Sequence, residues 1–276
     1  MGMRFGFRFP LQLEFNCLTL NSLNLKTRYS GRPHTSQPQM ITDFLPASDF
    51  FAQADWNSKI YLLLRHAERN HITPQDKDFG AHVGLTERGR RQAVSLGRVF
   101  PAFGDAVYFS SPVGRCVETA QCIAEGRKLA GYVDGAAVSA TSNGVASKGY
   151  AATVTPLDCL GDFFVRDVPA YEQTLREGFY EGICKWLDAG KHDAFYPLHE
   201  RAEQMREMMF EKASSRFNIF VTHDAWIVPC LSHFCNMKFE PKCWMNFLTG
   251  LAFEVPEKGD VKVAPITAME TGWLHF

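Results

Sequence analysis

The stretch YLLLRHAERN, residues 61–70, joins a short apolar run to a cluster of charged side chains. The run at 59–65, KIYLLLR, has the length and composition of a buried β-strand. At and just beyond its end stand Arg65, His66 and Arg69. A strand that ends in water accounts for one charged residue, but three at the same end indicate a functional site.

Strands and helices alternate along the rest of the chain. Further apolar runs of strand length occur at 105–111, at 153–160 as a weaker example, and at 217–223, and a last strand pair is expected at 247–255 and 260–266. Helical patterns occupy 85–100 with Thr86 as N-cap, 112–130 with Pro112 in the first turn, 169–190, 198–213, and a segment from Asp224 onward. This alternation predicts an α/β sandwich with a mainly parallel central sheet.

Residues 1–39 differ from the rest in composition. They hold five basic residues and one acidic residue, which is compatible with a transit peptide. The interpretation that we favour is a poorly structured leader or extension, followed by one domain over 40–276. A Gly-, Ala- and Ser-rich segment around 129–153 is expected to be an insertion in that domain.

Composition limits the classes of partner. With 276 residues, of which 46 % are apolar, the chain can bury a sizeable core. A net charge of -1 argues against nucleic acid or an anionic membrane as partner, and no apolar run approaches the roughly 20 residues of a spanning helix. The eight cysteines are scattered without close pairs, which favours a reduced, cytoplasmic protein. Cys230, His233, Cys235 and Cys243 admit a zinc site, but their apolar helical pattern favours packing, so no metal or other cofactor is expected.

Three of the predicted strands end in related chemistry. In α/β sheets, functional residues gather outside the carboxyl ends of the strands. The first strand ends at the cluster described above, the second is followed by Arg115, and the late strand by His223 and Asp224. One guanidinium group can donate two parallel hydrogen bonds to the oxygens of a phosphate, and a neutral imidazole can act as a nucleophile. The sequence therefore predicts a phosphate site at one sheet edge.

The motifs LLRHAER, LTERGRRQA, SSPVGRCVETA and VTHD follow one another over roughly residues 58–235. In this order they resemble the histidine phosphatase superfamily, also called phosphoglycerate mutase-like. The resemblance implies a three-layer α/β/α sandwich and phosphoryl transfer through a phosphohistidine, with no metal. It implies His66 as nucleophile, Arg65 and Arg115 as phosphate clamps, and His223 as a hydrogen-bond donor to the transferring group. Ala67 stands where the family usually has glycine.

The resemblance leaves the proton donor open between two acids. One branch of the family has a third arginine and a His-Asp pair, which implies Arg69 as a further phosphate ligand and Asp224 as the donor. The other branch places its acid after the third strand, where this chain has Asp162. We favour Asp224, because both features of the first branch occur together.

The function expected from the resemblance is a metal-independent phosphomonoester hydrolase acting on a small phosphorylated metabolite. The alternatives are a phosphoglycerate mutase-like phosphotransferase and a non-catalytic phosphate-binding module. Selectivity is expected from the segments that cover the pocket, 71–84 and 129–170, and the aromatic residues of the following helix are expected to be core.

Overall fold

The computed structural model describes residues 43–72, 80–101, 103–131 and 152–276. The predicted leader and most of the predicted insertion lie outside these residues. The strands are β1 (Leu45–Pro46), β2 (Lys59–Arg65), β3 (Ala106–Ser110), β4 (Val154–Pro156), β5 (Phe217–Thr222), β6 (Cys243–Met245), β7 (Thr249–Val255), β8 (Lys262–Thr267) and β9 (Trp273–His275). The helices are α1 (Ala47–Gln53), α2 (Glu87–Val99), α3 (Gly114–Leu129), α4 (Cys159–Asp162), α5 (Val168–Ala189), α6 (Leu198–Lys212) and α7 (Asp224–Cys235).

A seven-stranded sheet forms the centre of the fold, in the order β1-β8-β7-β2-β5-β3-β4. Strands β2, β5, β3 and β4 are parallel neighbours, whereas β7 pairs antiparallel with both β2 and β8. The short strands β6 and β9 make a separate antiparallel pair. The predicted α/β class with a mainly parallel central sheet is confirmed.

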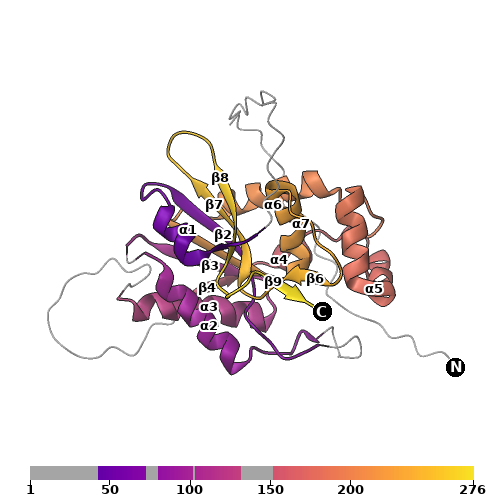
Figure 1. Ribbon diagram of the computed structural model, residues 1–276, viewed down its shortest axis with the longest axis horizontal. Coiled ribbons are helices and arrows are strands. Elements are labelled where there is room, and N and C mark those ends of the chain that lie inside the picture. The colour runs from indigo at the N-terminus through magenta and orange to yellow at the C-terminus, as the bar shows by residue number, and fades with distance from the viewer. Residues whose placement is uncertain (1–42, 73–79, 102, 132–151) are drawn as a thin grey trace. The chain divides into compact units, whose positions relative to one another are not determined.

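Each face of the sheet carries its own hydrophobic core, because alternate side chains of a strand point to opposite faces. In β2, Tyr61 and Leu63 join the core beneath α5, α6 and α7, while Leu62 and Leu64 join the core beneath α1, α2 and α3. Figure 1 shows these two groups of helices on either side of the sheet. The sandwich therefore has the three layers that the resemblance implied.

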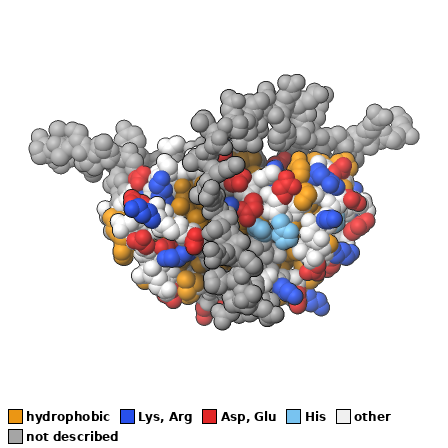
Figure 2. Space-filling view, turned by 90° about the horizontal axis from the view of Figure 1, so that it is seen from above, with side chains coloured by type: hydrophobic (Ala, Val, Ile, Leu, Met, Phe, Trp, Pro, Cys, Tyr) orange, Lys and Arg blue, Asp and Glu red, His pale blue; other side chains and the backbone are white. Residues whose placement is uncertain are grey.

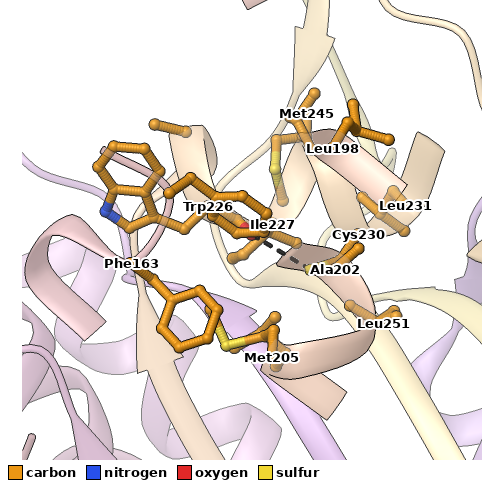
Figure 3. Close-up of a cluster of buried hydrophobic side chains, with 14 of the residues drawn as sticks. Phe163, Leu198, Ala202, Met205, Trp226, Ile227, Cys230, Leu231, Met245 and Leu251 are labelled. Carbon is orange, nitrogen blue, oxygen red and sulfur yellow. Dashed lines mark hydrogen bonds between the residues drawn. The ribbon is translucent and has the colours of Figure 1, made fainter. Parts of the chain in front are cut away.

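The core on the α5–α7 side is rich in aromatic and sulfur-containing side chains. Figure 3 shows part of it, where Ala202 and Met205 of α6 lie among side chains of α7 such as Ile227 and Leu231. All four are at most 1 % exposed. This packing fixes α7, which carries Asp224 at its first position.

Helices α2 and α3 pack without side chains at their closest point. A Cβ atom on Gly97 would lie 2.0 Å from the carbonyl oxygen of Ile123, and one on Gly126 would lie 2.0 Å from that of Val94. Only glycine permits so close an approach of two backbones. Because α3 also carries Arg115, this contact helps to position the predicted site.

Most predicted boundaries agree with the structure, with two differences. The Thr86 hydroxyl accepts a hydrogen bond from the amide of Gly89, as expected for an N-cap. Helix α3 begins at Gly114, so the expectation that Pro112 lies in its first turn is wrong. The weak strand predicted at 153–160 is only three residues long, and the chain then turns into α4.

The surface shows no dominant charge where the described residues are visible in Figure 2, since acidic and basic side chains alternate on that face. Among the helices in the described part of the chain, none combines the length and the apolar character that crossing a bilayer requires.

Candidate active site

The carboxyl ends of β2, β5 and β3 lie side by side, because these strands are parallel neighbours in register. Arg65 pairs with Thr222, and the amide of His66 donates to the carbonyl of Thr222 at 3.0 Å. The amide of Ser111 donates to Val221 in the same way, at 2.9 Å. The rings of His66 and His223 are consequently 5.6 Å apart, centroid to centroid.

His66 is buried and held in one orientation. Its Nδ1 lies 2.8 Å from the carbonyl oxygen of Ala67, which can only accept, so Nδ1 carries the proton. Nε2 accepts a hydrogen bond of 3.2 Å from Nε of Arg115. Burial first, and then the neighbouring imidazole and guanidinium groups, hold the pKa of His66 well below its ordinary value. The ring is therefore neutral, with a lone pair on Nε2.

Ala67 fits where the family usually has glycine. Among the described residues, the only non-glycine residues at positive φ are Asn236 and Leu248, so the Ala67 methyl group meets no backbone strain. The amide of Ala67 donates to the hydroxyl of Thr119 at 3.0 Å, and that hydroxyl donates to the carbonyl of Arg115 at 2.7 Å. Thr119 thus connects the loop of His66 to the arginine beside it.

Arg65 is buried, and three contacts hold its guanidinium group in one orientation. Its Nη2 lies 2.9 Å from Oδ2 of Asp224, and its Nη1 donates to the carbonyl of Met245. The guanidinium lies over the ring of Phe247, with Cζ 4.4 Å from the centroid. These contacts fix the plane of the guanidinium beside the two histidines.

Arg115 and Arg69 bring two more guanidinium groups to the same place. Nη1 of Arg115 donates to the carbonyl of Gly80 at 2.8 Å, and Nη1 of Arg69 donates to that of Asn70 at 2.9 Å. The buried Nε of Arg69 has no hydrogen-bond partner among the described residues. Burial and the charges of Arg65 and Arg115 lower the pKa of Arg69 to about 10. Arg69 remains a cation at neutral pH and has a donor to spare for an anion.

His223 directly precedes α7 and faces β3. Its Nε2 lies 3.2 Å from the Ser111 hydroxyl and 3.7 Å from Sγ of Cys116. Burial, and then Arg115, lower the pKa of His223 to about 3, against the opposing effect of Asp224. The second histidine is therefore also neutral before an anion binds.

Asp224 is ionised. Its Oδ2 accepts hydrogen bonds from Arg65 and from the indole of Trp244, the latter at 3.0 Å, and its Oδ1 accepts from the amide of Ala225 at 3.1 Å. Burial alone would raise the pKa of Asp224, but Arg65, His223 and the indole outweigh it and hold this pKa below its ordinary value. A carboxylate in this setting holds a cation in place.

Asp162 lies at the end of α4, beside β5 but outside the hydrogen bonds of the cluster. The carbonyl of Leu160 accepts from the Thr222 hydroxyl at 2.6 Å, and that of Gly161 accepts from the indole of Trp226 at 2.9 Å. Burial raises the pKa of Asp162, although Arg201 opposes this. No hydrogen bond within the described residues joins its carboxyl to either histidine.

The structure therefore brings together six of the seven residues predicted from the sequence, whereas Asp162 follows a backbone segment that is bonded to Thr222 and Trp226. Tyr171 of α5 is influenced by both acids: burial first, and then Asp224 and Asp162, raise the pKa of its phenol. Tyr180 of the same helix lies near Asp224, Arg65 and Arg69, and its ring is 4.9 Å from that of Trp244. Both tyrosines are half-buried and pack against the core on the α5–α7 side, which agrees with the expectation from the sequence.

Sequence reasoning missed the residues that hold Arg65 from the other side. Met245 is the last residue of β6, and Phe247 lies in the segment between β6 and β7. In the same segment Leu248 has a φ of 48°, which is unusual for a leucine. The amide of Leu248 donates to the carbonyl of His66 at 3.5 Å. The only local sign of this turn is Asn246, a residue common in turns.

The arrangement suits a dianion. Three guanidinium groups and the Asp224 carboxylate, with two neutral histidines, leave a net charge of about two positive units. A phosphate monoester carries about −1.5 to −2 at pH 7, so it would neutralise the site. Within the described residues, no three His, Cys, Asp or Glu side chains are grouped in a way that could hold a metal ion.

Three comparisons with known proteins give the following results. No curated protein matches the chain. Among solved structures, a phosphoserine phosphatase from Entamoeba histolytica shares 15 % identity, with a TM-score of 0.44 over 77 % of this chain and 98 % of that one. A putative alpha-ribazole-5'-P phosphatase from Escherichia coli shares 15 % identity, with a TM-score of 0.44 over 76 % and 97 %. A phosphoglycerate mutase from Bacillus anthracis shares 16 % identity, with a TM-score of 0.43 over 76 % and 93 %.

One family model matches the chain. Residues 61–135 match the histidine phosphatase superfamily, branch 1. The matched segment contains the first histidine of the pair, all three arginines and the helix that carries the third of them. The resemblance to the histidine phosphatase superfamily predicted from the sequence motifs is thereby confirmed.

Proposed function

We propose that the protein is a metal-independent phosphomonoester hydrolase that works through a phosphohistidine on His66. The observation that carries this proposal is the neutral ring of His66, whose Nε2 lone pair lies among three guanidinium groups. Phosphoryl transfer is mostly positioning and neutralisation of charge on the equatorial oxygens. Arg65, Arg69 and Arg115 supply both.

In the first step, Nε2 of His66 attacks phosphorus and the bond from phosphorus to the ester oxygen breaks. The arginines bind the equatorial oxygens, and the contact between Arg115 and Nε2 is exchanged for one to the phosphoryl group. The departing alkoxide takes a proton from an acid. In the second step water attacks the phosphohistidine and gives a proton to the carboxylate left by the first step. The bond from nitrogen to phosphorus breaks, which returns His66 to its neutral form, restores the acid and releases inorganic phosphate.

We assign the proton to Asp162 and a positioning role to Asp224. A general acid must be protonated when the ester bond breaks. The raised pKa of Asp162 supports that role, whereas Asp224 is ionised and bound to Arg65 and Trp244. This assignment departs from the preference for Asp224 that adjacency in the sequence suggested.

The expected substrate is a small phosphorylated metabolite, and the expected location is the cytoplasm. The free state of the seven cysteines within the described residues supports a reducing compartment. The net charge of -1 supports a small substrate rather than a nucleic acid.

Trapping of the intermediate tests the proposal. The protein is mixed with a ³²P-labelled aryl phosphate, quenched in base and analysed for acid-labile label, in wild type and in His66→Ala. We expect label and turnover in wild type and neither in the variant. Turnover without His66-dependent label would refute the mechanism, and binding of phosphate without turnover would favour the non-catalytic module. Transfer of label to a second alcohol in preference to water would favour the mutase-like alternative.

A further inference from the structure

A groove of about 480 Å³ opens beside the candidate active site. One wall is the segment 81–84, and the other is formed by the first two turns of α3. Arg115 belongs to both places, because it lines the groove while its Nε contacts His66 at 3.2 Å. Arg115 is thus the residue that the groove shares with the candidate active site.

The wall formed by 81–84 is attached to the catalytic arginine itself. The carbonyl of Gly80 accepts from Nη1 of Arg115 at 2.8 Å and from the amide of Val83 at 3.0 Å. On the far side, Oε2 of Glu118 accepts from the amide of Leu85 at 3.4 Å. Hydrogen bonds thus hold both ends of the wall formed by 81–84. This wall belongs to the segment 71–84, which was expected to control selectivity.

The lining combines five small apolar residues or glycines with four polar or charged ones. It consists of Ala81, His82, Val83, Gly84, Gly114, Arg115, Val117, Glu118 and Gln121. Its volume lies in the range of about 300–1,000 Å³ typical of small-molecule sites. The imidazole of His82 and the amide of Gln121 offer hydrogen bonds to an uncharged ligand.

The charged side chains of the lining, Arg115 and Glu118, already have partners within the protein. Arg115, the one guanidinium among the described lining residues, is bound to His66 and Gly80. Glu118 is a carboxylate that accepts from Nε of Arg90 at 2.7 Å. A second anionic group in the groove would meet this carboxylate and no free cation.

We propose that this groove holds the alcohol part of the substrate, and that this alcohol is uncharged. The proposal rests on the hydrolase function proposed above and narrows its substrates to phosphate monoesters of neutral alcohols. Esters whose alcohol part carries a carboxylate or a second phosphate should be poor substrates, because the site neutralises one phosphate and no more.

A matched pair of substrates tests the charge preference. 4-Carbamoylphenyl phosphate and 4-carboxyphenyl phosphate have nearly the same shape and differ in charge. We expect kcat/KM to be at least tenfold higher for the carbamoyl ester. Glu118→Gln removes the carboxylate from the groove and leaves Arg90 without this partner. The ratio of kcat/KM for the carbamoyl ester to that for the carboxy ester should therefore fall below about threefold in this variant. Equal values for the two esters in wild type would overturn the proposal.

Binding of the corresponding phosphonates, which cannot be hydrolysed, separates the groove from the chemistry. Calorimetry should show a Kd at least tenfold lower for the carbamoyl phosphonate than for the carboxy phosphonate. This preference without turnover of either ester would support the groove and refute the hydrolase function. Turnover of both esters with equal binding of the two phosphonates would refute the groove and leave the hydrolase function standing.

A variant that fills the groove tests its location. A Cβ atom on Gly114 has no heavy atom within 4 Å, so the backbone at this lining position accepts a side chain, and Gly114→Phe adds a ring there. We expect KM for the carbamoyl ester to rise at least fivefold, while Kd for inorganic phosphate changes less than twofold. Leu129→Phe is the control, since Leu129 is 57 % exposed at the other end of the same helix. An unchanged KM and phosphonate Kd in a folded Gly114→Phe protein would place the alcohol elsewhere.

Discussion

Exchange of each candidate acid for its amide separates the proton donor from the residue that holds Arg65. Asp224→Asn removes the charge 2.9 Å from Nη2 of Arg65, whose side chain is only 4 % exposed. A buried cation deprived of its partner costs about 3–5 kcal/mol of folding free energy. Because Arg65 keeps its contacts with Met245 and Phe247, we expect a loss near the lower end, about 3 kcal/mol.

Asp162→Asn breaks no ion pair of this kind, so it should leave the free energy of unfolding nearly unchanged. Its effect should instead depend on the leaving group. If Asp162 donates the proton, alkyl phosphates should slow by ~10²–10⁴-fold, which is the usual contribution of general acid catalysis. Aryl phosphates with acidic phenols should slow much less, because the phenolate leaves without a proton.

Asp224→Asn should slow alkyl and aryl esters by similar factors, because a displaced Arg65 weakens the binding of the phosphoryl oxygens in both reactions. The assay compares kcat for one alkyl and one aryl phosphate in wild type and both variants. Urea unfolding at the assay temperature shows that each variant is folded. A selective loss on alkyl phosphates in Asp224→Asn, with Asp162→Asn close to wild type, would refute the assignment and return the donor role to Asp224.

Two further predictions concern the scaffold and its response to pH. Gly126→Ala should lower the free energy of unfolding by about 1–3 kcal/mol or more, because the added methyl group meets the Val94 carbonyl. Gly114→Ala on the same helix is the control and should not destabilise the protein. Equal melting temperatures for the two variants would contradict this prediction. Stability should also fall as pH drops from 6.5 toward 5. The unfolded chain binds a proton on His223 near pH 6.5 while the folded pKa is about 3, and this contributes up to about 2 kcal/mol at pH 5. Folded His66 is shifted in the same direction, so His223→Gln should reduce the slope without removing it. A slope unaffected by His223→Gln would show that folding does not lower the pKa of His223 and would contradict this prediction.

The parts of the fold that could be predicted are those specified by neighbours in the chain. The apolar run of β2 and the N-cap of α2 depend on a few consecutive residues, and both lie where the pattern placed them. The weak strand predicted at 153–160 ends early because distant groups hold the backbone in another conformation. The Thr222 hydroxyl and the Trp226 indole bind the carbonyls of Leu160 and Gly161, and no local pattern reports these contacts.

The same distinction applies to the site, where residue types are local but charge states are not. Two histidines and three arginines could be placed at one sheet edge, because parallel strands bring their ends together. The ionisation of Asp224, however, depends on Trp244, 20 residues further along the chain, and on Arg65. Arg65 is itself held by the carbonyl of Met245, 180 residues away in the sequence. Adjacency to His223 made this aspartate look like an acid, and the tertiary contacts make it a carboxylate. A motif therefore predicts which side chains meet at such a site, and the packing around them decides which one can deliver a proton.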